Sequence, residues 1–156
     1  MRGDADVINT LNDLLAGELT AIDQYFLHSR MYENWGYNKL YERIEHERQD
    51  ETGHASALIK RILFLEGAPV LDKRDALRIG KTVPEMLRND LDLELEVVAD
   101  LRMAIALCEQ KGDFVSREIL EQMLDDTEED HAYWLEIQLR LVDQIGLQNY
   151  LQSQMS

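Results

Sequence analysis

The chain has 156 residues, 45% of them hydrophobic, which is enough for one domain with a sizeable core, expected to span residues 1–156. Eight glycines and two prolines are few, which favours long helices over a fold of strands and turns. A formal net charge of −15 argues against a nucleic-acid partner bound through a basic surface.

The first two predicted helices follow from apolar side chains that recur at helical spacing. The first helix covers residues 4–34 and is ended by Gly36. The second covers residues 38–66 and stops at Gly67, which is followed two residues later by Pro69.

The last helices have clear start and stop signals. Thr82, with a proline in the next turn and Glu85 three residues later, predicts a capping box at the start of the third helix. Gly112 ends that helix. The fourth helix is predicted over residues 114–145, and a short tail helix over residues 147–154.

The connections predict how these helices are arranged. Gly36 and Gly112 give tight turns, so the first two helices pair antiparallel, and so do the last two. Residues 67–81 form a 15-residue connection that reaches about 50 Å when extended, enough to run along the bundle. The sequence therefore predicts an all-α four-helix bundle, built from two hairpins joined by a long crossover, with a short fifth helix.

Two short runs repeat a Glu-x-x-His spacing, Glu51 with His54 and Glu128 with His131. Residues three apart lie on one face of a helix, so each run can direct a carboxylate and an imidazole to one point. Two such pairs, with one further Glu from each of two other helices, form the ligand set of a di-iron or di-manganese site in a four-helix bundle. The further acids are Glu18, 33 residues before the first run, and Glu94, 34 residues before Glu128.

Each of these four acids interrupts an apolar helix face, as Glu18 does between Leu15 and Ile22. Burying carboxylates without partners is costly, and no Lys or Arg falls on the apolar faces beside them. Two divalent ions would balance four negative charges, and oxygen-rich ligands with one imidazole per metal suit iron or manganese. The alternative is a buried hydrogen-bond network of Glu and His without metal.

Other polar residues near this face have two interpretations each. Tyr25 could hydrogen-bond a ligand carboxylate or donate an electron, or it could be a core tyrosine. Glu47, one turn before Glu51, could be an outer ligand or a transit site for metal, or it could form a structural salt bridge. His46 and Asp50 share a face away from the dinuclear centre, where they could hold an ion together or remain a solvated pair.

The sequence has no apolar signal segment and no apolar run long enough to cross a membrane, so a cytoplasmic protein without a membrane partner is expected. The single cysteine, Cys108, excludes an internal disulfide framework. It lies on an apolar face and is expected to be a small buried hydrophobic residue.

Several runs resemble those of the bacterioferritins and the closely related bacterial ferritins: MRGD at 1–4, DQYFLH at 23–28, RILFLEG at 61–67, VSR at 115–117 and GLQNYL at 146–151. The resemblance covers essentially the whole chain. It implies a ferritin-like fold and a homo-oligomeric cage of 24 subunits that oxidises Fe(II) and stores ferric mineral inside. It also implies a ferredoxin as a partner for iron release.

The resemblance implies that six side chains hold two Fe ions per subunit in a ferroxidase centre: Glu18 and His54 on one ion, Glu94 and His131 on the other, and Glu51 and Glu128 bridging them. Tyr25 matches the tyrosine beside this centre. His46 with Asp50 matches an iron site on the inner surface of the cage.

The chain departs from the bacterioferritin pattern at Thr52. Bacterioferritins bind haem b between two subunits through a methionine one place after the second-helix Glu, and a threonine cannot act as a thioether ligand. Haem is therefore not expected. Subunits of this type resemble haem-poor ferritin partners, which form cages alone or co-assemble with a haem-binding bacterioferritin subunit.

A second departure is Thr127, which makes the acidic run before His131 one residue longer than the family's common form. A single insertion in a helix is often absorbed as a π-bulge, and such bulges favour functional sites. We therefore predict a π-bulge near Thr127.

An iron-storage ferroxidase is the leading functional hypothesis. The alternatives are a haem-poor subunit of a mixed bacterioferritin cage and a non-storage di-iron or di-manganese redox enzyme, such as a substrate oxidase or a manganese catalase. A structural cage subunit with an inactive centre is a further alternative, against which the complete ligand set argues.

Overall fold

The computed structural model describes residues 1–156, and all of its regular secondary structure is helical. Residues 114–145 form one continuous rod whose middle turn is a π-helix. The predicted all-α bundle and its helix boundaries are confirmed to within two residues. The elements are α1 (Ala5–Trp35), α2 (Asn38–Phe64), α3 (Val83–Gln110), α4 (Phe114–Asp125), η1 (Asp126–Ala132), α5 (Tyr133–Ile145) and α6 (Leu147–Ser153).

The helix ends follow from their capping residues. The Asp4 side chain accepts hydrogen bonds from the first backbone N–H groups of α1, and Gly36 ends that helix at a φ of 85°. At the start of α3, Thr82 accepts from the backbone N–H of Glu85, whose own carboxylate accepts from the N–H of Lys81. The predicted capping box therefore forms, except that the Glu85 carboxylate bonds to the N–H of Lys81 and not to that of Thr82 itself.

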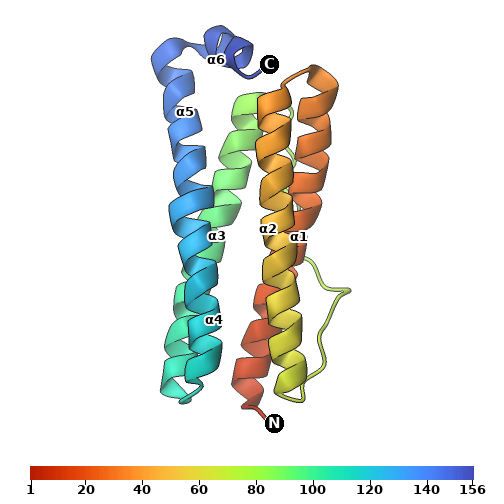
Figure 1. Ribbon diagram of the computed structural model, residues 1–156, viewed down its shortest axis with the longest axis vertical. Helices are drawn as coiled ribbons and strands as arrows, with labels where there is room; N and C mark the ends of the chain where they lie inside the picture. The colour runs from red at the N-terminus through yellow and green to blue at the C-terminus, as the bar shows by residue number, and fades with distance from the viewer.

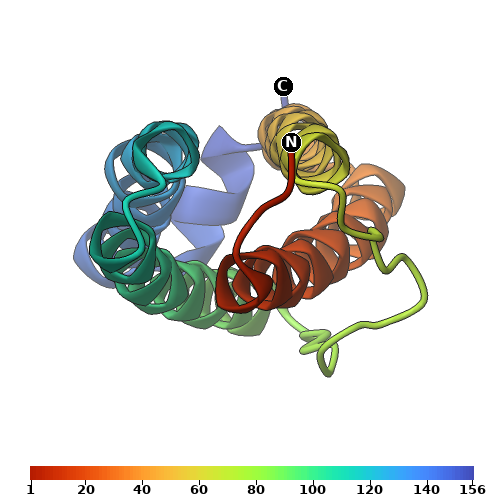
Figure 2. The ribbon, with the colours of Figure 1, turned by 90° about the horizontal axis from the view of Figure 1, so that it is seen from below.

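The four long rods form a bundle of two antiparallel hairpins (Figures 1 and 2). α1 and α2 make one hairpin, and α3 makes the other with the α4–η1–α5 rod. The segment between α2 and α3 runs from one end of the bundle to the other, so that α2 and α3 point the same way. α6 lies across the end of the bundle where α3 begins. This is the predicted topology with a long crossover.

The crossover is fixed to one face of α1 by hydrogen bonds from its backbone. A segment without secondary structure must find partners for its N–H groups elsewhere. Polar side chains spaced four or eight residues apart along α1 supply them: Val70 N donates to Asn12 Oδ1, Asp75 N to Thr20 Oγ1, Arg78 N to Gln24 Oε1 and Gly80 N to His28 Nε2.

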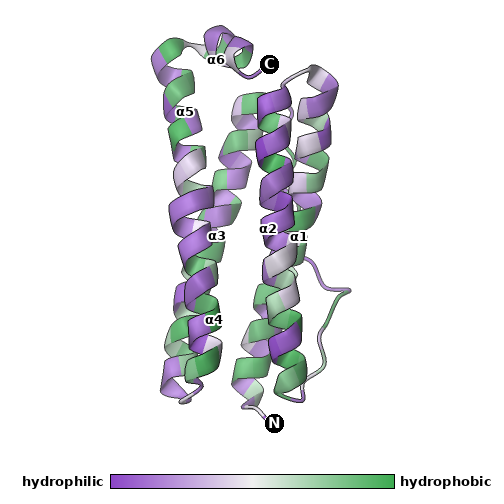
Figure 3. Ribbon diagram, viewed as in Figure 1, coloured by the Kyte–Doolittle hydropathy of each residue, from purple (hydrophilic) through white to green (hydrophobic).

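Two apolar clusters fill the bundle, one towards each end. One surrounds Leu15, Leu58 and Leu101, and the other surrounds Tyr25 and Leu87. Polar side chains occupy the height between them, where η1 appears as a largely hydrophilic stretch in Figure 3. Cys108 is buried in the first cluster, as expected. None of the helices is both long and apolar enough to span a membrane.

Candidate metal centre

Two clusters of ligand-type side chains meet at mid-height in the bundle. Glu18, Glu51 and His54 form one, and Glu51, Glu94 and His131 form the other. Within each cluster the candidate ligand atoms lie within 4.8 Å of one another, and all five residues are buried. Because Glu51 belongs to both clusters, its carboxylate lies between two adjacent positions for a cation.

The His54 ring directs one nitrogen inward and the other outward. Nδ1 lies 3.4 Å from Glu51 Oε2 and 3.6 Å from Glu18 Oε2. Nε2 lies 2.9 Å from Asp126 Oδ2, at the surface of the bundle. A carboxylate on the outer nitrogen fixes the ring so that the inner nitrogen is available to a metal. The sequence reasoning missed Asp126, because its approach to His54 depends on the π-helix.

The His131 ring repeats this arrangement on the other side of Glu51. Its Nδ1 is 2.9 Å from Glu51 Oε1 and 3.4 Å from Glu94 Oε1. Its Nε2 contacts Glu47 and lies 3.1 Å from Asp50 Oδ2. The two imidazole rings are 6.2 Å apart and tilted by 24°. The centre is therefore close to symmetrical about Glu51.

The buried carboxylates raise the pKa of the groups around them, so that protons are held more tightly at this centre. Burial by itself lowers the pKa of His54, but the carboxylates of Glu51 and Asp126 on either side of the ring together outweigh it and raise the pKa to about 9. The pKa of His131 is raised too, since bonds to Glu47 and Glu51 overcome its burial. Burial and the charge of Glu51 raise the pKa of Glu94 to about 7. Cations bound here would replace protons.

Several inward-facing atoms have no partner within the protein. Both oxygens of Glu18, Oε2 of Glu94 and Nδ1 of His54 are buried and make no hydrogen bond. Unpaired buried carboxylate oxygens are costly, so a Glu–His network alone does not satisfy this site. Divalent iron or manganese fits it, because each position offers carboxylate oxygens and one imidazole nitrogen.

Tyr25 is buried against the centre. Its hydroxyl donates a hydrogen bond to Glu94 Oε1. Burial and the neighbouring charge of Glu94 raise the pKa of Tyr25 well above its ordinary value, so the phenol keeps its proton. Of the interpretations open from the sequence, the structure shows the hydrogen bond to a carboxylate.

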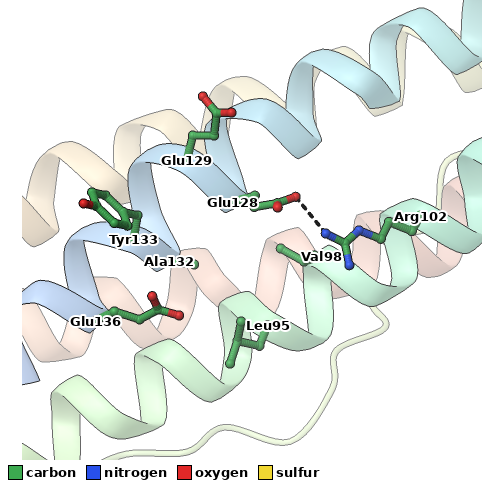
Figure 4. A pocket seen from close by; sticks show the side chains of 8 residues that line it. All are labelled: Leu95, Val98, Arg102, Glu128, Glu129, Ala132, Tyr133 and Glu136. Carbon is green, nitrogen blue, oxygen red and sulfur yellow. Dashed lines mark hydrogen bonds and ion pairs between the residues drawn. The ribbon is translucent and has the colours of Figure 1, made fainter.

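Glu128 is the one member of the expected six that the structure does not bring to the centre. Its side chain is 47% exposed, and Oε2 accepts a bond of 3.0 Å from Arg102 on α3 (Figure 4). The predicted π-bulge near Thr127 is confirmed and is the cause. A π turn holds more residues than an α turn, so Thr127 shares the buried face with His131, and Glu128 is turned away.

A third acidic group lies beside the centre. Glu47, Asp50 and Asp130 gather around the outer nitrogen of His131. Arg43 bridges two of these acids, at 2.6 Å from Glu47 and 2.8 Å from Asp130. Asp50 therefore lies against the dinuclear centre and not on a face away from it, because the His131 ring reaches across to within 3.1 Å of its carboxylate.

His46 stands apart from this group. It is 60% exposed, and Nε2 is 3.5 Å from Asp50 Oδ2. Thr52 is also exposed, and its hydroxyl donates to the carbonyl of Arg48 in its own helix. Neither side chain points into the centre.

A four-helix bundle with a long crossover and facing Glu/His clusters is the arrangement of the ferritin-like carboxylate proteins. The chain belongs to this family, since the family model described as a ferritin-like domain matches residues 8–145. It is 64% identical over 156 residues to a bacterial ferritin of Synechocystis sp., covering 100% of both chains. It is 62% identical over 154 residues to a bacterial ferritin of Pseudomonas aeruginosa, covering 99% of both. It is 46% identical over 150 residues to a bacterioferritin of Mycobacterium leprae, covering 96% of this chain and 94% of that one.

Proposed function

We propose that this protein stores iron and is a ferroxidase that oxidises Fe(II) at the centre around Glu51. The observation that carries the proposal is the pair of adjacent buried clusters that share this carboxylate and keep unpaired ligand atoms. The relatives described as bacterial ferritins support it. The ferric product is stored in a cage of 24 copies of the chain.

The iron is substrate and cargo. Two Fe(II) ions each give up one electron, and one O2 molecule takes these two electrons with two protons to become hydrogen peroxide. Holding the two ions side by side makes this two-electron step possible at one site. The carboxylates offset part of the rise in positive charge.

Five side chains are proposed as direct ligands. Glu18 and His54 bind one ion, Glu94 and His131 bind the other, and Glu51 bridges them. The other residues act through these ligands. Asp126 orients His54, while Glu47 and Asp50 orient His131. Tyr25 holds the Glu94 carboxylate through a hydrogen bond, and we propose that it also donates an electron.

Replacing both Glu51 and His54 with Ala tests the proposal. The shared bridge and one imidazole are then lost, so we expect rapid oxygen-dependent Fe(II) oxidation to fall at least about a hundredfold. Glu42→Ala, an exposed change on the same helix, is the control and keeps the rate. Rapid oxidation that survives the double change refutes the site assignment. Light scattering after size-exclusion chromatography measures the mass of the particle. A mass that corresponds to a monomer or dimer contradicts the storage function.

Thr52 limits the proposed cage to two forms. Without a methionine at that position, the chain forms haem-free cages or shares a cage with a haem-binding subunit. Mass analysis of the subunits in the native particle distinguishes these two forms.

A further inference from the structure

Glu128 borders a cavity on the surface of the bundle. The cavity has a volume of about 560 Å³ and lies between α3 and the η1–α5 rod. Its lining includes Val98, Arg102, Glu128 and Ala132. Figure 4 shows the Glu128 side chain reaching across to the Arg102 guanidinium, with Val98 below.

This cavity adjoins the metal centre. On α3, Glu94, Val98 and Arg102 follow one another at intervals of one turn, so Arg102 lies about 12 Å along the helix from Glu94. On the other wall, Ala132 directly follows His131. The five candidate ligands do not line the cavity, but two of its lining residues, Val98 and Ala132, lie within one helical turn of Glu94 and His131. Glu128 and Arg102 lie in the wall of the same cavity.

The charges of the centre favour a move of Glu128 towards it. Two divalent ions carry four positive charges, whereas Glu18, Glu51 and Glu94 supply three negative ones. The neighbouring Glu47 is already paired with Arg43. Asp126 and Asp50 lie against the outer nitrogens of His54 and His131. A fourth carboxylate would complete the balance, and Glu128, three residues before His131, is paired only with Arg102, which is 60% exposed.

The bond that holds Glu128 is weak enough to be exchanged. Exposed ion pairs contribute little to stability, because water screens both charges. The surrounding segment is a π-helix, and its backbone is wound more widely and less regularly than that of the α-helices on either side. A metal ion in a buried site attracts a carboxylate more strongly than an exposed guanidinium does.

We propose that Arg102 is a positioning residue that holds Glu128 outside the centre until two metal ions occupy it, when Glu128 leaves Arg102 and supplies the fourth carboxylate. This inference rests on the proposed function. The Arg102–Glu128 pair sets how tightly the centre binds its metal, since each binding event must break it.

Cobalt binding to the assembled, metal-free protein tests this, because Co2+ gives a visible absorption and is not oxidised under the anaerobic conditions used. Affinity is measured for the wild type, Arg102→Gln, Glu128→Gln and the double variant. We expect the Arg102→Gln protein to bind Co2+ about two- to fivefold more tightly, because Arg102 no longer competes with the metal for the Glu128 carboxylate and an exposed ion pair is weak. Glu128→Gln is expected to bind at least about tenfold more weakly. Arg102→Gln is expected to have no further effect once Glu128 is Gln.

Comparing Arg102→Gln with and without Glu128→Gln shows whether Arg102 acts on Co2+ affinity through Glu128 or only through its positive charge. Arg78→Gln, which removes an arginine paired with Glu96 of the same helix α3, is the matched control and is expected to leave Co2+ affinity unchanged. The inference is overturned if Arg102→Gln leaves affinity unchanged, or if it acts equally with and without Glu128. It is also overturned if a crystal structure with two Co2+ ions retains the bond between Arg102 and Glu128. Failure of the wild type to bind two Co2+ ions per subunit would instead refute the proposed function.

Discussion

At the scale of single residues, each imidazole of the centre stands between carboxylates on both sides. His54 faces Glu51 with Nδ1 and Asp126 with Nε2, and His131 faces Glu51 and Asp50 in the same way. The outer acid holds the ring, and the inner nitrogen is left for metal or for a proton. The protonation of these rings therefore links pH, metal binding and stability.

The metal-free protein is expected to lose stability as the pH rises from 6.5 to 9. The pKa of His54 is raised from 6.5 to about 9 in the folded chain. Its proton therefore stabilises the fold fully below pH 6.5, and this contribution is lost as the pH passes 9. The raised pKa of Glu94, about 7, acts in the same direction between pH 4.5 and 7. Urea unfolding of chelator-treated protein at pH 6.5, 7.5 and 9 measures the change.

His54→Gln is the control for this window. It removes the titrating group, so the fall in unfolding midpoint between pH 6.5 and 9 is expected to become smaller. A wild-type midpoint that is constant or rises over this window contradicts the prediction.

At the scale of elements, the crossover is held to α1 by hydrogen bonds from its backbone, although it has no regular structure. Polar side chains on α1 accept hydrogen bonds from its N–H groups, and two of these side chains are buried against Asp90. Gln24 Nε2 and His28 Nδ1 both lie 2.8 Å from Asp90 Oδ1. Gly80 closes the segment, in close contact with the backbone of Met86. The crossover is thereby tied to both hairpins.

Replacing Gly80 with Ala is expected to destabilise the protein by about 1–3 kcal/mol, because a Cβ there would lie 2.5 Å from the backbone N of Met86. Hydrogen exchange of the Asp75 and Gly80 amides is expected to become faster. Gly17→Ala is the matched control. Its Cβ meets only Asp75 Oδ2, at 3.7 Å, and a helical Ala stabilises by about 0.5–1 kcal/mol. Equal stability of the two variants would show that the Gly80 contact is not restrictive.

At the scale of the whole molecule, the bundle keeps large apolar side chains on its outside. Phe26, Leu27, Phe64 and Leu71 are each about half exposed in the single chain. In the proposed assembly of many copies, these side chains would be available for contacts between chains. Thr52 would lie there at the position that carries the haem ligand in bacterioferritins.

Thr52→Met is expected to give the assembled protein a haem site. The exposed Thr52 hydroxyl bonds only to the carbonyl of its own helix, so the change leaves the bundle intact. Expression with haem available is expected to give the absorption of haem bound by two thioethers in the variant and not in the wild type. Stoichiometric haem in the wild type would refute the interpretation of Thr52.

Much of the fold and part of the candidate metal centre could be predicted from the sequence, and the rest depended on the tertiary structure. Periodicity, caps and glycines predicted the helices, the crossover and the bundle, because these signals act between residues close in the chain. The positions of Glu18, Glu51 and Glu94 were also predictable, since each is an acid in an apolar helix face. Even the π-helix could be predicted, from the insertion at Thr127.

The directions in which the π-helix turns its side chains could be seen only in the tertiary structure. The Glu-x-x-His spacing assumes α-helical winding, and the wider turn directs Glu128 to Arg102 and Asp126 to His54. The partners of the crossover were hidden for a similar reason, since Thr20 and Asp75 are 55 residues apart. Local sequence thus determined which helices form and which acids they bury. Packing between distant segments determined which acid each histidine meets, because those contacts depend on the rotation of one helix against another.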